Sequence, residues 1–134
     1  MSYIGQEPSQ VALAASDIAD DLITSAKLNY SETALTDQAT ITWNAETQDV
    51  AKVTLAGNRT LSSATSGTTG QFISLLIIQD GTGSRTLTWN AAYEFAADTA
   101  PTLTTTAAKG DLFVFRYNGS KWLEVGRNQT LTLS

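Results

Sequence analysis

Residues 113–125 read Phe113-Val114-Phe115-Arg116-Tyr117-Asn118-Gly119-Ser120-Lys121-Trp122-Leu123-Glu124-Val125. Apolar side chains alternate with others on both sides of Asn118-Gly119, and this pair is typical of the two positive-φ positions of a type I′ turn. The stretch therefore predicts a β-hairpin. Phe113, Phe115 and Tyr117 share one face of its first strand, so we expect these aromatic rings to lie in the core.

Short alternating segments of the same kind continue through the chain from Ala39, with turn residues about every 8 to 12 positions. Each segment predicts a half-buried strand. The expected strands are Thr40–Trp43, Val50–Leu55, Gln71–Gln79, Thr86–Trp89, Pro101–Thr105, Leu112–Tyr117, Trp122–Val125 and Thr130–Leu133. The predicted fold class is therefore all-β, with residues 39–134 forming an antiparallel β-sandwich or a jelly-roll-like domain.

Residues 1–38 differ in character from the rest of the chain, because they contain several acidic groups and an alanine-rich stretch over residues 11–23. Ile18 and Leu22 fall on one helical stripe, which favours a short helix. The apolar face of this helix is narrow, so an extended segment that orders only against a partner agrees equally well with the residues. We expect an N-terminal arm over residues 1–38, extended or partly helical.

The charge balance bears on possible partners. Acidic residues (13) outnumber basic ones (8), for a net charge of -5, which is the opposite of the pattern that binds nucleic acid. Charged residues make up 16% of the chain, against about 25% in typical proteins, and threonine and serine fill the polar positions. Such a surface suits faces that become buried against neighbours, although an ordinary β-sandwich with threonine-rich outer faces gives the same composition.

Neither a membrane span nor a signal peptide is evident. The apolar run of residues 72–78 is too short to cross a bilayer, which takes about 20 residues, so we expect a buried strand and no membrane partner. The opening residues Met1–Pro8 lack a basic segment followed by an apolar stretch. We therefore expect a mature chain made in the cytoplasm.

The residues that carry most enzyme chemistry are missing. The chain has no histidine and no cysteine, which removes the commonest general base, the usual nitrogen and thiolate metal ligands, and any disulfide. Ser25 and Lys27 stand in the stretch nearest to a serine–lysine motif, but at a level expected by chance in a Ser/Thr-rich chain. The loop of residues 80–84 lacks the alternating acids and closing glutamate of a calcium loop, so we expect a tight turn. We predict no catalytic, cofactor-binding or metal-binding residues, and no enzyme.

Two further side-chain groups leave alternatives open. Paired carboxylates can hydrolyse glycosidic bonds, and the candidates are Asp37, Glu46, Asp49, Glu94, Asp98 and Glu124. Nearly all of them lie in predicted loops, where acids are typical turn formers, and no spacing makes two of them converge. Trp43, Trp89 and Trp122 can stack on sugar rings, although core or interface packing is commoner for tryptophan at strand ends.

A six-residue segment occurs twice. Thr40-Ile41-Thr42-Trp43-Asn44-Ala45 returns as Thr86-Leu87-Thr88-Trp89-Asn90-Ala91. The likeness indicates two strands that end in the same way, but no solenoid period accompanies it.

Several segments resemble structural proteins of tailed bacteriophages. The likeness is carried by Val53-Thr54-Leu55-Ala56-Gly57-Asn58-Arg59-Thr60-Leu61, by Gly70-Gln71-Phe72-Ile73, and by Gln79-Asp80-Gly81-Thr82-Gly83-Ser84-Arg85-Thr86-Leu87-Thr88-Trp89. Residues 1–5 and 18–28 are similar to the N-terminal parts of phage tail-fibre-like proteins. The resemblance implies a non-enzymatic virion structural protein, made in the host cytoplasm and commonly assembled as a homotrimer.

Two locations in the virion follow from this resemblance. The residues up to Ser134 show no long repetitive shaft, and we expect no separate receptor-binding tip. This expectation favours a capsid decoration (cement) protein on the capsid surface, bound to the major capsid protein and stabilising the head. The alternative is a tail-fibre or tail-associated module that binds a host surface glycan. For that alternative we expect Trp43, Trp89 or Tyr93 at the contact.

Overall fold

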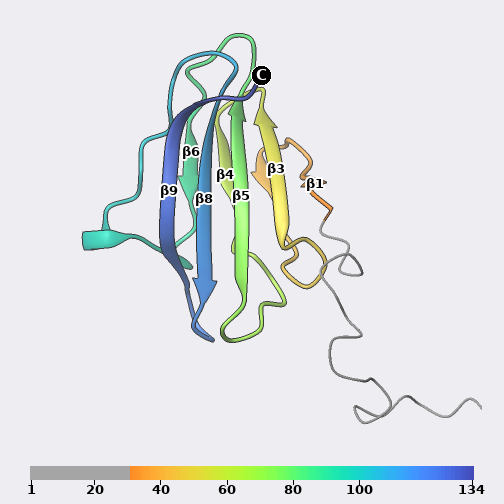
Figure 1. The fold of residues 1–134 in the computed structure, drawn as a ribbon, viewed down its shortest axis with the longest axis vertical. Helices are drawn as coiled ribbons and strands as arrows, with labels where there is room; N and C mark the ends of the chain where they lie inside the picture. Colours follow the sequence, from red (N-terminus) through yellow and green to blue (C-terminus); the bar gives the residue numbers. More distant parts are fainter. Residues whose placement is uncertain (1–30) are drawn as a thin grey trace, which may run out of the picture.

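Two β-sheets enclose the apolar core of the computed structural model, which describes residues 31–134 (Figure 1). The larger sheet has six strands in the order β1-β3-β5-β8-β9-β7, and the smaller has three in the order β2-β4-β6. The elements are β1 (Thr33–Ala34), β2 (Thr40–Ile41), β3 (Val50–Leu55), β4 (Arg59–Leu61), β5 (Phe72–Gln79), β6 (Leu87–Trp89), β7 (Tyr93–Glu94), the 3₁₀ helix η3 (Ala96–Asp98), β8 (Lys109–Tyr117) and β9 (Trp122–Thr132).

From β1 to β6 the chain passes alternately through the two sheets. β1, β3 and β5 are parallel in the larger sheet, and β2, β4 and β6 are parallel in the smaller one. Each pair of consecutive strands therefore makes one turn of a coil, and three turns are stacked. Thr40 pairs with Thr60, and Thr60 pairs with Thr88, so successive turns differ in length. This inequality explains why the sequence shows no solenoid period.

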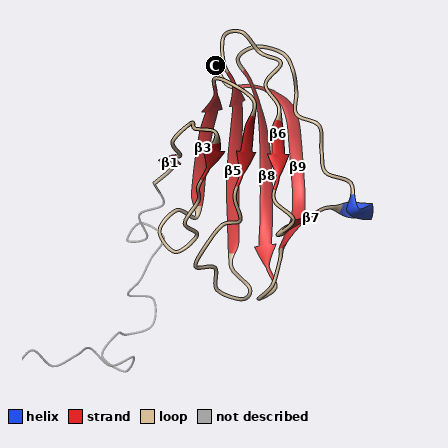
Figure 2. Cartoon of the chain, turned by 180° about the vertical axis from the view of Figure 1, so that it is seen from behind, coloured by secondary structure: helices blue, strands red, loops and turns tan. Residues whose placement is uncertain are grey.

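Antiparallel pairing is confined to the second half of the larger sheet, where β8 pairs with β5 and β9 pairs with β8. β7 lies parallel to the start of β9, and Figure 2 labels β7 near the lower end of β9. The predicted all-β class is confirmed, but the expectation of an antiparallel sandwich or jelly roll is wrong for the coil. Side chains alternate between faces in parallel and antiparallel strands alike, so alternation does not reveal strand direction.

The predicted hairpin is confirmed at residues 117–122, where Tyr117 pairs with Trp122. Its turn is not type I′, because Gly119 has a positive φ of 95° while Asn118 does not. The connection is a four-residue loop in which the Asn118 side-chain oxygen accepts hydrogen bonds from the amides of Ser120 and Lys121, at 2.9 and 2.7 Å. The asparagine side chain thus replaces the backbone geometry that the sequence suggested.

Other strand predictions were met unevenly. The expected strand Pro101–Thr105 is a loop, because the Thr104 amide bonds to the side chain of Asp111 in β8 and not to the backbone of a neighbouring strand. β4 and β7 were not predicted, since each is too short to show alternation. A single strand, β9, covers most of the two strands expected over residues 122–125 and 130–133.

The core lies between the two sheets and confirms the expected burial of Phe113 and Phe115. Tyr117 is half-buried and its ring packs against Trp122, with centroids 4.6 Å apart. Trp43 and Trp122 are fully enclosed, as is usual for tryptophan at strand ends.

The N-terminal segment is described only from residue 31. The helix considered around Ile18 and Leu22 lies outside the described residues, as do Ser25 and Lys27. Thr33–Ala34 pair with β3, and Leu35 is buried in the core, so the larger sheet begins before residue 39. Within residues 31–134 no helix is long and apolar enough to cross a membrane.

Candidate functional site

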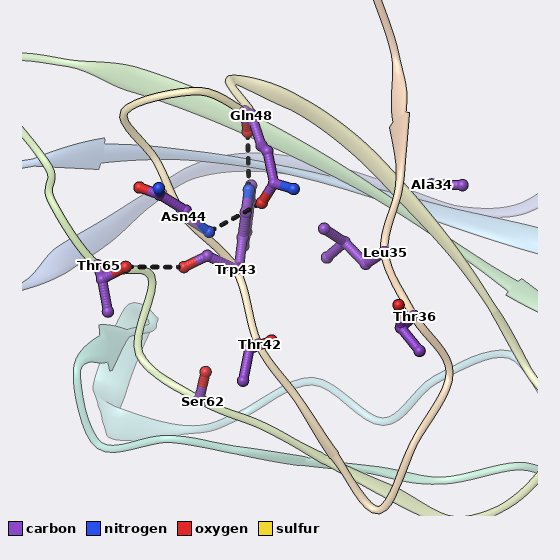
Figure 3. Close-up of a pocket in the computed structure, with 9 residues that line it drawn as sticks. All are labelled: Ala34, Leu35, Thr36, Thr42, Trp43, Asn44, Gln48, Ser62 and Thr65. Atoms are coloured by element: carbon purple, nitrogen blue, oxygen red, sulfur yellow. Dashed lines mark hydrogen bonds between the residues drawn. The ribbon is translucent and has the colours of Figure 1, made fainter.

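Two surface pockets contain the aromatic residues singled out in the sequence. The first, with a volume of about 280 Å³, surrounds Trp43 in the first turn of the coil (Figure 3). The Trp43 indole Nε1 donates to the Gln48 carbonyl oxygen at 2.7 Å, and the Gln48 side chain accepts from the Asn44 amide at 2.9 Å. Because Trp43 is fully buried and its N–H is occupied, it offers little ring surface to a ligand.

The second pocket, called here the Trp89 pocket, has a volume of about 270 Å³. It lies where the end of β6, β7, η3 and the hairpin loop meet. Its lining residues are Trp89, Asn90, Ala91, Tyr93, Glu94, Phe95, Asp98, Ala100 and Lys121. The pairing of Tyr93 with Trp122 and of Glu94 with Leu123 brings the hairpin loop to this place.

Trp89 forms the aromatic wall of this pocket. Its ring is half-buried and meets the rings of Tyr93, Phe95 and Phe113 edge-on, with centroids 5.7, 5.1 and 5.0 Å away. Its Nε1 atom is buried and finds no acceptor among residues 31–134. Buried indole N–H groups usually have a partner, so this donor is the one polar group of the wall whose hydrogen bond is unaccounted for.

Tyr93 is only 4% exposed and serves the fold first. Its hydroxyl donates to the Ser62 carbonyl at 2.9 Å and accepts from the Ala64 amide at 3.0 Å, which ties β7 to the segment after β4. Burial raises the pKa of Tyr93. The hydroxyl is therefore occupied and neutral, and only the ring of Tyr93 can contribute to the pocket.

Three charged side chains form the rim of the Trp89 pocket. Lys121 Nζ bonds to Glu94 Oε2, and Glu94 shares a side-chain hydrogen bond with Asp98. This shared bond and the charge of Glu94 raise the pKa of Asp98. The pKa of Glu94 is lowered by the bond to Asp98 and then by Lys121, and the bond to Glu94 raises the pKa of Lys121. The rim therefore presents both acceptors and donors.

The backbone beneath the rim is strained. Ala97 and Asp98 have φ values of 56° and 52°, a region that costs non-glycine residues roughly 1–2 kcal/mol each. Figure 2 shows η3 projecting from the sheets. Asp98, at the end of this left-handed segment, lines the Trp89 pocket together with Glu94.

The carboxylates considered as a catalytic pair are mostly dispersed. Asp37 is bound by Arg59 at 2.8 Å, Asp49 accepts from Gln71 Nε2 at 2.6 Å, Glu124 lies 3.3 Å from Arg127, and Glu46 is exposed. Only Glu94 and Asp98 come together. Both line the Trp89 pocket, and each shifts the pKa of the other.

The loop of residues 80–84 is the expected tight turn. Asp80 Oδ1 accepts from the amides of Thr82 and Gly83, at 3.0 and 2.8 Å, and Oδ2 pairs with Arg85 at 2.8 Å. These bonds, Arg85 foremost, lower the pKa of Asp80 to about 2. Across residues 31–134, no cluster of three acidic, cysteine or histidine ligands could hold a metal ion.

Of the glycan contacts predicted from sequence, the structure brings Trp89 and Tyr93 together and places Trp43 in the other pocket. Asn90 and Lys121 also line the Trp89 pocket and were not predicted. Asn90 follows Trp89 in the repeated segment, so the repeat could have indicated Asn90 as a residue of the pocket. Lys121 has no local signal, because it reaches the pocket only through the register of β7 on β9.

Comparison with known proteins gives one result. A protein-family model described as "Putative phage tail fibre C-terminal domain" matches residues 35–122. The matched region runs from Leu35, directly after β1, to Trp122 at the start of β9, and it includes every residue that lines the Trp89 pocket. No curated protein matches the chain.

Proposed function

The chain belongs to the family of phage tail-fibre C-terminal domains, and on this basis we propose that it binds a glycan of the host surface at the Trp89 pocket. Family membership makes it a structural protein associated with the virion. The family is that of a tail component, so it supports the tail-fibre alternative better than the capsid-decoration role, and it offers no support for the major capsid protein as partner.

The observation that carries the glycan proposal is the half-buried ring of Trp89 beside a rim of charged side chains. Sugars present flat apolar patches edged by hydroxyl groups, and they are bound where an aromatic surface adjoins a few fixed polar groups. The Trp89 pocket supplies that combination, with Asn90, Glu94, Asp98 and Lys121 beside the indole. Carboxylates that accept from sugar hydroxyls and a lysine that donates to them are the expected polar contacts.

The charged rim of the Trp89 pocket is better suited to binding a glycan than to cleaving one. Glu94 and Asp98, the two candidate acids that meet, interact with each other, and Glu94 also bonds to Lys121, so both belong to a rim of mutually paired groups that suits hydrogen bonding to a bound sugar. We therefore expect the glycan to be bound and released unchanged.

The test is calorimetric titration of the full chain with surface polysaccharide purified from the bacterium that the phage infects. Asp98→Asn removes the charge, and asparagine tolerates the left-handed φ of this position. We expect it to weaken binding by about tenfold, because hydrogen bonds to charged groups are strong. The control is Glu46→Gln, an exposed acid outside the pocket. Absence of binding to any host polysaccharide, or equal binding by Asp98→Asn, contradicts the proposal.

A further inference from the structure

The rim of the Trp89 pocket holds more carboxylates than cations. Glu94 and Asp98 both line the pocket, and among residues 31–134 the only cation that lines it is Lys121. Two ionised acids and one ammonium leave one negative charge in excess. The hydrogen bond and the charge of Glu94 raise the pKa of Asp98, and a proton on Asp98 makes the rim neutral. In neither state does the rim carry a net positive charge.

The cation of the rim is already engaged, because Lys121 Nζ bonds to Glu94 Oε2. A carboxylate or phosphate on a sugar would have to draw Lys121 away from Glu94, since within residues 31–134 no second cation lines the pocket. The Glu94 carboxylate would then stand without its partner beside another anion. Like charges placed side by side at a binding surface are strongly unfavourable. The ion pair of Lys121 and Glu94 therefore opposes acidic ligands.

Solvent screening adds to this opposition, because the two members of the ion pair are not equally exposed. The side chain of Lys121 is 47% exposed, and that of Glu94 is 29% exposed. Water and salt weaken the field of an exposed charge more than that of a partly buried one. A ligand in the pocket therefore meets a field in which the carboxylate outweighs the ammonium.

The next cation along the sheet lies too far from the rim to reverse this balance. Arg116 pairs with Leu123 in the register of β8 on β9, and Leu123 pairs with Glu94 in the register of β9 on β7. Two strand spacings of about 4.8 Å each therefore separate Arg116 from Glu94, which is about the distance over which salt screens a charge. Arg116 does not line the pocket. The whole chain has a net charge of -5, which repels polyanions at longer range.

We propose that the Trp89 pocket selects sugars that carry no acidic group, and that Glu94 is the residue that excludes acidic ones. This inference rests on the proposed glycan-binding function and adds the class of sugar to it. Neutral sugars supply the hydroxyl donors that carboxylates accept, and their apolar patches can lie on the half-buried Trp89 ring. Uronic acids, sialic acids and phosphorylated sugars bring a further anion to the rim. Specificity then comes from a repulsive element as well as from attractive contacts.

The test compares two forms of one polymer by calorimetric titration of the full chain. The reduced form is surface polysaccharide purified from the bacterium that the phage infects, with any carboxyl groups reduced to alcohols. The oxidised form is the same reduced polymer after its primary hydroxyls have been converted to carboxylates. We expect the reduced form to bind and the oxidised form to bind at least about tenfold more weakly, because like charges a few ångströms apart repel by at least that factor in affinity.

Glu94→Gln shows whether the rim causes the preference. The amide keeps the shape of the side chain, removes its charge and frees Lys121 to donate to a carboxylate. We therefore expect the preference for the reduced form to fall to about threefold or less. Glu46→Gln is the matched control, because it removes the same charge from an exposed acid outside the pocket. This variant should keep the wild-type preference.

The outcomes separate this inference from the proposed function. Equal affinity of wild type for the two forms overturns the inference and leaves glycan binding at the pocket intact. The same preference in Glu94→Gln as in wild type also overturns it, since the discrimination then arises elsewhere. Binding to the untreated polysaccharide that is lost when its carboxyl groups are reduced overturns it as well. Absence of binding to every form, the untreated polysaccharide included, contradicts the proposed function itself, and the inference falls with it.

Discussion

The indole of Trp89 meets the ring of Phe113 edge-on, with centroids 5.0 Å apart. Phe113 stands in the fully buried centre of β8, whereas Trp89 ends β6 at the surface. The same tryptophan therefore belongs to the core and to the wall of the pocket. Substitutions of Trp89 can therefore be tested separately for their effects on stability and on ligand binding.

Trp89→Ala should destabilise the fold by about 3 kcal/mol, because it removes three edge-on ring contacts and leaves a cavity. Trp89→Phe keeps most of the packing and removes a buried N–H without a partner, so it should cost less than about 1.5 kcal/mol. Urea unfolding followed by circular dichroism measures both. Equal losses in the two variants would contradict the stabilising role of the ring contacts.

Gly83 and Gly81 give a matched pair within one loop. Gly83 has φ of 75°, and a Cβ there would come within 2.5 Å of the Thr105 carbonyl oxygen, whereas a Cβ on Gly81 meets nothing within 4 Å. Gly83→Ala should therefore cost about 2 kcal/mol or more, and Gly81→Ala should change stability by less than about 0.5 kcal/mol. Denaturant midpoints of the two variants check this. Similar midpoints would contradict the close packing of residues 80–84 on the loop before β8.

Asp111 is the buried charge that fastens the loop of residues 101–105 to β8 and β9. Its carboxylate accepts from Thr104 Oγ1 at 2.6 Å, from the Thr104 amide at 2.7 Å and from the Thr130 amide at 3.0 Å. Asp111→Ala leaves the Thr104 amide without its acceptor and leaves the Thr130 amide only the Thr104 hydroxyl, at 3.1 Å, and it should cost about 3 kcal/mol. The exposed Glu46→Ala is the control. Hydrogen exchange should show faster opening at Thr104 and Thr130 in Asp111→Ala alone, and uniform protection would contradict this role.

The folded state should lose stability in acid, because the carboxylates of two ion pairs at the turns of the coil become protonated. Arg59 and Arg85, through their hydrogen bonds, lower the pKa values of Asp37 and Asp80, that of Asp80 from 3.8 to about 2. A lowered folded-state pKa stabilises the fold fully above the unfolded-state pKa, and this contribution is lost as pH falls from about 4 towards 2. Asp80→Asn should lower the melting temperature at neutral pH and reduce the further loss at about pH 3. If the melting temperature of Asp80→Asn fell in acid as much as that of wild type, the ion pair of Asp80 would not be the cause of the acid sensitivity.

The sequence predicted those parts of the fold that depend on local alternation. The strand Val50–Leu55, the hairpin and the burial of Phe113 and Phe115 all follow from side chains that alternate every second residue. The parallel coil did not follow, since its turns differ in length and strand direction leaves no mark on alternation. The loop at Pro101–Thr105 resembled a strand because threonine and leucine alternate there, but Asp111 takes its hydrogen bonds.

The candidate site was predictable in part. Aromatic residues that can bind sugars are visible in the sequence, and Trp89 and Tyr93 were named for that reason. Their separation from Trp43, and their approach to Lys121, depend on which strands become neighbours. Pairing between strands far apart in the sequence sets these distances, and no local signal reports it.

The most direct test of the glycan-binding account compares the same substitution in the two aromatic pockets. Trp89→Phe and Trp43→Phe each replace an indole with a smaller ring, but Trp89 is half-buried and lines the Trp89 pocket, whereas Trp43 is fully buried. Calorimetric titration with the host surface polysaccharide should show about tenfold weaker binding for Trp89→Phe, because the smaller ring offers less surface to a sugar, and wild-type binding for folded Trp43→Phe. Wild-type affinity in Trp89→Phe, or an equal loss in Trp43→Phe, would contradict glycan recognition at the Trp89 pocket.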